Sequence, residues 1–239
     1  MAQHSQAGCS GCTGGSRLIV TARDVGICFS TGDTRTWAVR HASLSVGAGQ
    51  MTMVFGPSGS GKSSLLYLLS GMRPASEGEV RYEGRLLSGG NSRQVRQLRF
   101  TDFGFVFQQH FLVGYLTAAE NVCIGRPRRY LERACNLLEE LGLAAKINAY
   151  PAQLSYGQRQ RVALARALVH LPRVVFADEP TASVDSDLSM GICQILSDYC
   201  DQGGSCVMVT HDMALKTYAD AVYSMRDGLL RPDTVCAGQ

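Results

Sequence analysis

A glycine-rich stretch carries the clearest chemistry in the sequence. It fits the phosphate-loop pattern G-x-x-x-x-G-K-[ST] with the residues Gly56, Pro57, Ser58, Gly59, Ser60, Gly61, Lys62 and Ser63. Such a loop points successive backbone N–H groups at phosphate oxygens, because glycine has no Cβ in the way, and the following helix adds its positive end. Lys62 supplies a point charge between the outer phosphates. The stretch therefore predicts a nucleotide-binding site.

Two hydroxyls and two carboxylates extend this prediction to hydrolysis. The Ser63 hydroxyl is expected on Mg²⁺, and Ser64, one step along the helix, on an inner phosphate. Asp178 and Glu179 follow the apolar run 174–177, which puts both acids at the carboxyl edge of a parallel sheet, where ligands bind. Asp178 is placed to hold the metal shell and Glu179 to orient and deprotonate the attacking water. Without other motifs, an acidic pair after a strand is a solvated surface feature about as often as it is part of a functional site. The phosphate loop favours the catalytic interpretation.

A further anion site is indicated by the start of a helix near residue 155. Ser155 and Gln158 precede an apolar-periodic run and match a capping box. A helix start preceded by a serine and a glycine, here Gly157, also suits an anion. These residues can cap the helix, grip a γ-phosphate, or do both. The local pattern leaves open which molecule the phosphate belongs to.

The elements expected around these residues alternate between strand and helix. Residues 51–55 are a short apolar run typical of a buried strand and 62–70 have helical composition, so the glycine loop joins a strand to a helix. Upstream, 18–29 and 37–46 alternate apolar with polar residues around a turn cluster at 31–33, which predicts an antiparallel pair. Alternating strands and helices indicate a parallel sheet. Further strands are expected at 78–87, 103–107, 174–177 and, last, 206–210, with helices at 94–99 and 187–199.

Two segments depart from this alternation. Between about 110 and 168 apolar residues recur at three- and four-residue intervals, which predicts an inserted helical lobe. Residues 1–16 are rich in Gly, Ser and Ala, and we expect a flexible tail there. Cys9 and Cys12 could form a metal or redox pair, but no second Cys or His pair at metal-site spacing follows, which favours the tail.

Composition limits the function classes. The chain has 239 residues, 45% of them hydrophobic and 18% charged, which suits one sizeable α/β domain. A net charge of +3 with scattered Lys and Arg predicts no nucleic-acid partner. Apolar runs fall short of the roughly 20 residues that span a bilayer, and no secretory signal opens the chain. We therefore expect a cytosolic chain whose cysteines remain thiols.

The segment Leu154-Ser155-Tyr156-Gly157-Gln158 resembles the signature of ABC-transporter ATPases, and the resemblance extends over nearly the whole chain. It implies an α/β fold: a phosphate-loop NTPase (RecA-like) parallel-sheet core with an antiparallel β subdomain and an inserted helical subdomain. The nucleotide-binding domain would then span 17–239, with the helical subdomain at approximately 110–168.

The same resemblance implies roles for further residues. Gln108 looks like the Q-loop glutamine, a metal and water ligand that senses the membrane partner. His211 looks like the switch histidine that contacts the γ-phosphate. Phe29 falls where the family places an aromatic that stacks on adenine, with Trp37 as the substitute. Ser183 and Asp185 resemble the D-loop.

The resemblance also implies partners and cofactors. Two copies would face each other head to tail and bind ATP and Mg²⁺ between them. Each ATP would lie between the phosphate loop of one copy and residues of the other. The pair would dock on an integral membrane permease subunit at the cytoplasmic face of the inner membrane. The residues implied to act in trans are Ser155, Tyr156, Gly157, Gln158, Ser183 and Asp185.

Softer motifs favour one branch of the family. The segments FGFVFQ at 103–108, LTAAENV at 116–122 and YPAQLS at 150–155 look like the MacB and LolD branch, which couples ATP hydrolysis to export or lipoprotein release. An FtsE-like ATPase that drives a membrane partner without transport is the alternative. A DNA-repair or translation ABC protein disagrees with the modest charge and the single site. A small-molecule kinase or GTPase leaves the signature and His211 unexplained.

Three residues depart from the family pattern. Tyr156 replaces the usual first glycine of the signature, and a tyrosine would be strained if that position required φ > 0. Ser64 stands where threonine is usual and Val184 where leucine is usual, both mild changes. These differences bear on the rate of the reaction and leave its type unchanged.

Overall fold

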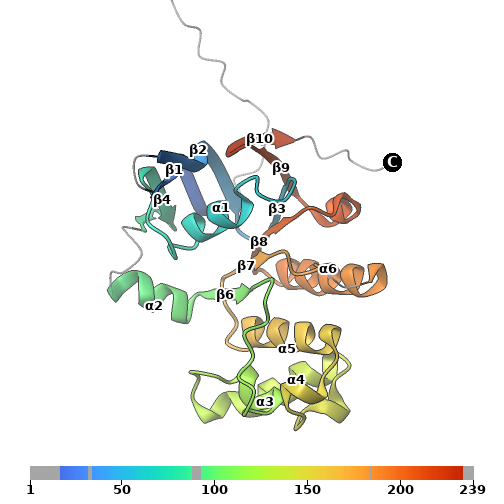
Figure 1. Ribbon diagram of the computed structural model, residues 1–239. Helices are drawn as coiled ribbons and strands as arrows, with labels where there is room; N and C mark the ends of the chain where they lie inside the picture. Colours follow the sequence, from blue (N-terminus) through green and yellow to red (C-terminus); the bar gives the residue numbers. More distant parts are fainter. Residues whose placement is uncertain (1–16, 32–33, 88–92, 183–184, 234–239) are drawn as a thin grey trace, which may run out of the picture.

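The computed structural model describes residues 17–31, 34–87, 93–182 and 185–233. Figure 1 shows a twisted sheet with helices packed on it and a helical lobe beyond its lower edge. The predicted tail at 1–16, with Cys9 and Cys12, lies outside the described residues. The described strands form a ten-stranded sheet in the order β5-β4-β1-β2-β10-β9-β3-β8-β7-β6.

One half of the sheet is antiparallel. The long strands β1 (Leu18–Thr31) and β2 (Thr34–Gly47) pair antiparallel, and β4 (Glu77–Tyr82) joins the free side of β1, followed by the short β5 (Arg85–Leu86). Alternation of apolar and polar residues predicted the first pair correctly. The helix α2 (Arg93–Thr101) lies between β5 and β6 in the chain and so connects this half to the other.

The other half is built on parallel pairs. β6 (Phe103–Val106), β7 (Val174–Asp178), β8 (Ser205–Thr210) and β3 (Met51–Phe55) pair in this order, all parallel. The carboxyl ends of β3, β7 and β8 therefore meet at the same edge of the sheet. The phosphate loop, the two acids and His211 each follow one of these ends, so the topology gathers them at this edge.

Helices cover both faces of this half. Met51, Met53 and Phe55 of β3 pack with residues of α5 (Tyr156–Leu168) and α6 (Ser186–Asp201). Val54 belongs to the opposite core, which it shares with α1 (Lys62–Leu69) and with the antiparallel strands. Successive side chains of β3 thus point to opposite faces of the sheet, so that α1 packs on one face and α5 and α6 pack on the other.

The C-terminal part differs from the expectation that 206–210 is the last strand. After the short 3₁₀ segment η4 (Met213–Tyr218), β9 (Ala221–Arg226) runs parallel to β3, and β10 (Leu229–Asp233) returns antiparallel and bridges to β2. Asp227 and Gly228 form the turn with φ of +50° and +78°. An Asp-Gly pair with positive φ favours a tight hairpin, so the turn signal was present in the sequence.

The lobe contains α3 (Ala118–Val122), α4 (Leu131–Glu140) and α5, joined by the 3₁₀ turns η1 (Arg128–Tyr130), η2 (Ala144–Lys146) and η3 (Pro151–Gln153). Its entry is fixed by the buried Asn121, whose amide donates to carbonyls of the segment 113–117 and accepts from the N–H of Val113. Within the part of the chain that the structure describes, no helix combines the length and apolar character that a bilayer crossing requires.

Candidate nucleotide site

The phosphate loop requires glycine at its two ends. Gly61 precedes α1 with φ of +102°, and a Cβ there would lie 2.0 Å from the carbonyl oxygen of Ala38. A Cβ on Gly56 would lie 2.2 Å from the carbonyl oxygen of Met225 on β9. Both contacts are with backbone, so no side-chain movement would relieve them. The close approach of β2 and β9 therefore shapes the loop that the motif predicts.

Lys62 lies folded against this loop. Its Nζ donates to the carbonyl oxygens of Gly56 at 2.8 Å and Pro57 at 3.0 Å, and it lies 3.2 Å from Oε1 of Glu179. Only 5% of Lys62 is exposed. A buried ammonium group needs such partners, because leaving it unpaired out of water is costly. The lysine is thus held between the loop and the catalytic acid predicted from the sequence.

Asp178, at the end of β7, is hydrogen-bonded by two hydroxyls of α1. Ser63 Oγ donates to Oδ1 at 2.7 Å and the Tyr67 hydroxyl donates to Oδ2 at 2.9 Å. Burial, followed by the neighbouring Asp178 carboxylate, raises the pKa of Tyr67 to about 12, so its hydroxyl keeps its proton and remains a donor. The acid is 4% exposed and depends on these donors.

Glu179 and His211 form a second contact at the sheet edge. His211 Nδ1 lies 2.7 Å from Oε2 of Glu179, and the backbone N–H of Glu179 donates to the carbonyl of Val209 at 2.9 Å. Glu179 has φ of +47°, a conformation that few residues other than glycine adopt. Because Asp178 and Glu179 differ so much in backbone conformation, their carboxylates have different neighbours although they are adjacent in the chain.

A cavity of about 320 Å³ is lined by Lys62, Glu179 and His211, among other residues. The structure thus brings together most of the residues predicted for one nucleotide site. The residues that line the cavity are Ala38, Ser58, Gly59, Gly61, Lys62, Ser63, Ser64, Gln108, Glu179 and His211.

The predicted adenine-stacking residue lies outside that lining. Phe29 is 39% exposed on β1, and the guanidinium carbon of Arg73 lies 5.5 Å from the centre of its ring. The partly exposed ring already has a cationic neighbour. The ring of Trp37, the alternative, packs against Gly26.

The residues of the signature-like segment begin α5, away from this cavity. Ser155 caps the helix: its Oγ accepts from the N–H of Gln158, and the side chain of Gln158 accepts from the N–H of Ser155. The predicted capping box is confirmed. The condition for strain at Tyr156 is not met, because its φ is not positive and it occupies the first helical position. Its ring meets His110 edge-on, with centroids 4.5 Å apart.

Of the predicted D-loop, Asp185 is described and Ser183 lies outside the described residues. Asp185 caps α6 by accepting from the N–H of Leu188 at 2.8 Å. A Cβ on Gly157 would lie 2.5 Å from Cδ2 of Leu188, so the start of α5 packs closely on the start of α6. The two predicted trans elements are therefore neighbours in the fold.

Comparison with known proteins agrees with this geometry. The family model described as ABC transporter matches residues 39–182, more than half of the chain. The chain belongs to the ABC transporter family. It is 40% identical over 216 residues to an uncharacterized ABC transporter ATP-binding protein of Methanocaldococcus jannaschii, covering 88% of this chain and 96% of that protein. This ABC transporter subunit is an ATPase, and its nucleotide is ATP.

Longer relatives point to the predicted branch. The macrolide export ATP-binding/permease protein MacB of Pasteurella multocida is 40% identical over 212 residues, which cover 86% of this ABC subunit but only 33% of MacB. Among solved structures, a dimeric bacterial ABC transporter cassette superposes with a TM-score of 0.85 at 31% identity, covering 92% of this chain and all of that one. A dimeric cassette in a post-hydrolysis state with ADP and phosphate gives 0.82 at 30% identity. The resemblance to the MacB and LolD branch is confirmed.

The donor set of this ABC ATPase fits the metal that its fold implies. The Ser63 hydroxyl and the Asp178 carboxylate are 2.7 Å apart, and the side chain of Gln108 lines the same cavity as Ser63. All three offer oxygen, the ligand atom that Mg²⁺ prefers. The small number of protein ligands also suits Mg²⁺, which usually keeps substrate phosphates and waters in its shell.

One contact residue was missed at the level of sequence. Tyr67 falls within the helix predicted at 62–70 and no role was predicted for it, yet its hydroxyl donates to Asp178. A usable signal existed, because Tyr67 lies four residues after Ser63 and therefore on the same face of α1. A polar group at that spacing after the phosphate-loop serine can reach the same acid.

Proposed function

We propose that this ABC ATPase works as a head-to-tail homodimer that drives a separate membrane subunit for export or lipoprotein release. The observation that carries the proposal is the separation of two anion-binding elements. The cavity holds Lys62, Glu179 and His211, while the capped start of α5 at Ser155 lies outside its lining. A second copy would bring its own Ser155 to this cavity. The dimeric cassettes among the similar structures support this arrangement.

Within each site different residues act as the base, bind the phosphates and hold the metal. Glu179 is the general base, oriented by Lys62 on one carboxylate oxygen and by His211 on the other. Lys62 and the backbone N–H groups of the glycine loop hold the phosphates. Ser63, Asp178 and Gln108 would hold Mg²⁺, which when bound neutralises charge that develops on the phosphates. Loss of the γ-phosphate would then weaken the contacts between copies and open the pair.

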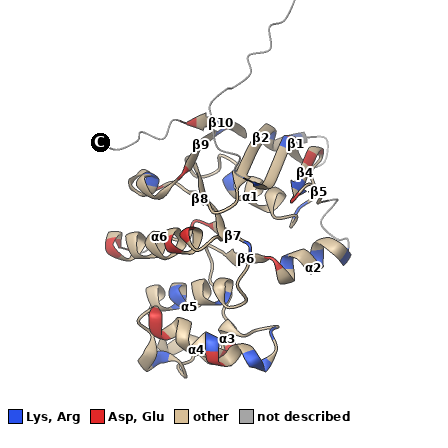
Figure 2. Cartoon of the chain, turned by 180° about the vertical axis from the view of Figure 1, so that it is seen from behind, with Lys and Arg blue, Asp and Glu red and all other residues tan. Residues whose placement is uncertain are grey.

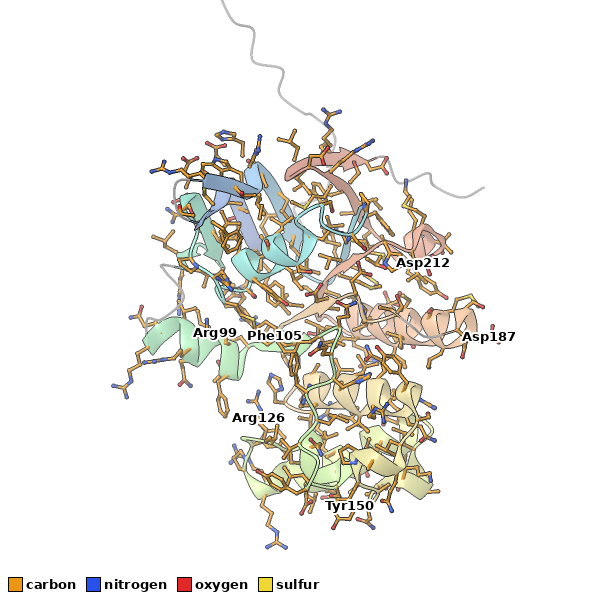
Figure 3. The ribbon with its side chains drawn as sticks, in the orientation of Figure 1. Arg99, Phe105, Arg126, Tyr150, Asp187 and Asp212 are labelled. Atoms are coloured by element: carbon orange, nitrogen blue, oxygen red, sulfur yellow. The ribbon has the colours of Figure 1, made fainter. Side chains whose placement is uncertain are left out.

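A groove between α2, β6 and the lobe is the proposed contact with the membrane subunit. This lobe groove has a volume of about 570 Å³, and its lining includes Tyr67, Arg99, Phe105, Phe111, Arg126 and Arg166. Figure 3 shows Arg99 and Phe105 on the core side and Arg126 on the lobe side. Among the described residues that line it, three are arginines and none is Asp or Glu.

Charge complementarity identifies the kind of segment that fits. The helices α2 and α5, on either side of the lobe groove, contain Arg residues and no acid, and Figure 2 colours their basic positions blue. Exposed Phe111 and Ile124 add apolar surface to the groove. We therefore propose an apolar helix of the membrane subunit that carries at least one carboxylate. Docking there would place this ATPase at the cytoplasmic face of the inner membrane.

The catalytic assignment is tested with Glu179→Gln. The variant should bind ATP as wild type does and form an ATP-dependent dimer in size-exclusion chromatography. Its phosphate release should fall about 100-fold or more, because the base is gone. Glu140→Gln, at an exposed position of α4, is the matched control and should keep full turnover. Full turnover in Glu179→Gln would contradict the role of the base.

The head-to-tail arrangement has its own test by mixing two inactive variants. Lys62→Ala removes the phosphate-loop lysine and Ser155→Arg blocks the trans element. If sites are built across copies, half of the mixed dimers' sites are intact, and about a quarter of wild-type activity should return on mixing. If each copy builds its own site, no activity returns.

The lobe groove is tested by co-purification with the co-expressed membrane subunit. Arg126→Glu should abolish the co-purification, and the exposed neighbour Arg128→Glu should not.

A further inference from the structure

The helix α1 presents two hydroxyls to one carboxylate. Ser63 and Tyr67 lie one turn apart, and they donate to Oδ1 and Oδ2 of Asp178 at 2.7 Å and 2.9 Å respectively. Asp178 is 4% exposed, so water contributes little to holding either oxygen. The two hydrogen bonds therefore fix the plane of the carboxylate relative to α1, and the Tyr67 bond fixes the oxygen that lies away from Ser63.

We propose that Tyr67 is a positioning residue for the metal, and that its hydroxyl sets the Mg²⁺ affinity of the nucleotide site by holding Asp178. This inference rests on the proposed function in one respect, the assignment of Ser63 and Asp178 as metal ligands. Tyr67 itself touches neither metal nor nucleotide. It acts through Oδ2, keeping Oδ1 turned toward Ser63 and the phosphate loop. Partners of this kind orient a ligating carboxylate before the metal arrives.

The reach of the side chain explains why a tyrosine serves here. The ring of Tyr67 lines the lobe groove together with Arg99 and Phe105, while its hydroxyl reaches Asp178. A tyrosine side chain extends from the groove to Asp178 as a rigid unit with few rotatable bonds, so the position of its hydroxyl is well defined. Replacing Tyr67 by Phe removes the donor and keeps the ring in the groove wall. Any change in metal affinity is then due to the hydroxyl alone.

A second tyrosine that donates to a carboxylate provides a control. Tyr82 is 1% exposed and donates its hydroxyl to Oδ2 of Asp102 at 2.8 Å. Tyr82→Phe therefore removes the same type of hydrogen bond, from a phenol to a carboxylate, but away from the nucleotide cavity. Both variants should lose similar stability in a thermal melt. Only Tyr67→Phe should change the response to metal.

The experiment uses the full chain with Glu179→Gln in all samples, so that ATP is bound and not consumed. A fluorescent ATP analogue is titrated with Mg²⁺ at a fixed temperature below every melting transition, and Mn²⁺ binding is followed by electron paramagnetic resonance. For Tyr67→Phe the metal concentration at half-maximal binding should rise about tenfold. For Tyr82→Phe it should change less than about twofold. Affinity for the analogue in EDTA should be the same in all three proteins.

The outcomes separate this inference from the proposed function. An unchanged metal midpoint in Tyr67→Phe overturns the inference while leaving the Mg²⁺ site intact. An equal loss of affinity with and without metal also overturns it, because that pattern means a displaced helix. If the parent protein itself binds the analogue without any response to Mg²⁺ or Mn²⁺, the proposed metal ligands are wrong.

Discussion

Protonation of His170 should destabilise the fold below neutral pH. His170 follows α5, and its Nε2 lies 3.0 Å from the carbonyl oxygen of Phe103 on β6. Burial, and next the positive charge of Arg126, lower the pKa of His170 to about 4, while the nearby Asp102 acts in the opposite direction. The ring is therefore neutral in the folded chain at pH 5.5, and its Nε2–H donates to that carbonyl.

The sign of the effect follows from the two protonation states. An unfolded chain has an ordinary histidine with a pKa of about 6.5, so between about pH 4 and pH 6.5 it binds more protons than the folded chain. Stability contributed by His170 is thus present above pH 6.5 and is lost as pH falls. Linkage gives a loss of about 1.3 kcal/mol between pH 7.5 and 5.5, which partial exposure of the ring reduces to about 1 kcal/mol.

Urea unfolding at pH 7.5 and 5.5, at constant ionic strength, measures this difference. Other groups titrate over the same range, so wild type is compared with His170→Gln, whose amide can still donate to the Phe103 carbonyl. The variant should lose about 1 kcal/mol less than wild type on acidification. His41→Gln is the control, because the side chain of His41 is 69% exposed. An identical loss in wild type and His170→Gln would refute the reasoning.

Three further substitutions test the fold and the loop. Asn121→Ala should lower the free energy of unfolding in urea by about 3 kcal/mol, because it strips buried hydrogen bonds from 113–117, and an unchanged midpoint would contradict this. Gly61→Ala should weaken ATP binding at least about tenfold in a fluorescence titration, because its Cβ would collide with backbone; Gly84→Ala, where φ is also positive but no atom lies within 4 Å, should not. Tyr156→Gly should lower Tm, because an unstrained helical residue is replaced by one that disfavours helix by about 1 kcal/mol; a rise in Tm would mean that the tyrosine is strained.

The core of the site could be predicted from sequence because its signals are local. The phosphate loop is contiguous and lies between a five-residue buried strand and a helix, so both its conformation and its chemistry follow from neighbouring residues. Asp178 ends a buried strand and Glu179 follows it, and parallel strands put their carboxyl ends at one edge. These two facts alone bring Lys62 and Glu179 together, and the ion pair between them is 3.2 Å long.

The parts that sequence reasoning missed depend on contacts between distant segments. The β9–β10 hairpin closes the sheet between β2 and β3, and Met225 on β9 limits the space at Gly56, 169 positions earlier in the chain. Tyr156 faces His110 across the lobe, which no local pattern indicates. The strain expected at Tyr156 came from a family position, whereas the capping box at Ser155 makes that residue an ordinary first helical residue. Local capping chemistry was the better guide there.

The contacts inside the cavity connect the proposed base to the side chains proposed to bind phosphate. Both oxygens of Glu179 are engaged, one by Lys62 at 3.2 Å and the other by His211 at 2.7 Å. Lys62 and His211 are also the side chains proposed to contact the outer phosphates, so a phosphate in the cavity would compete with Glu179 for both partners. Phosphate binding would therefore change the hydrogen-bond partners of the proposed base, which links the position of Glu179 to the presence of substrate.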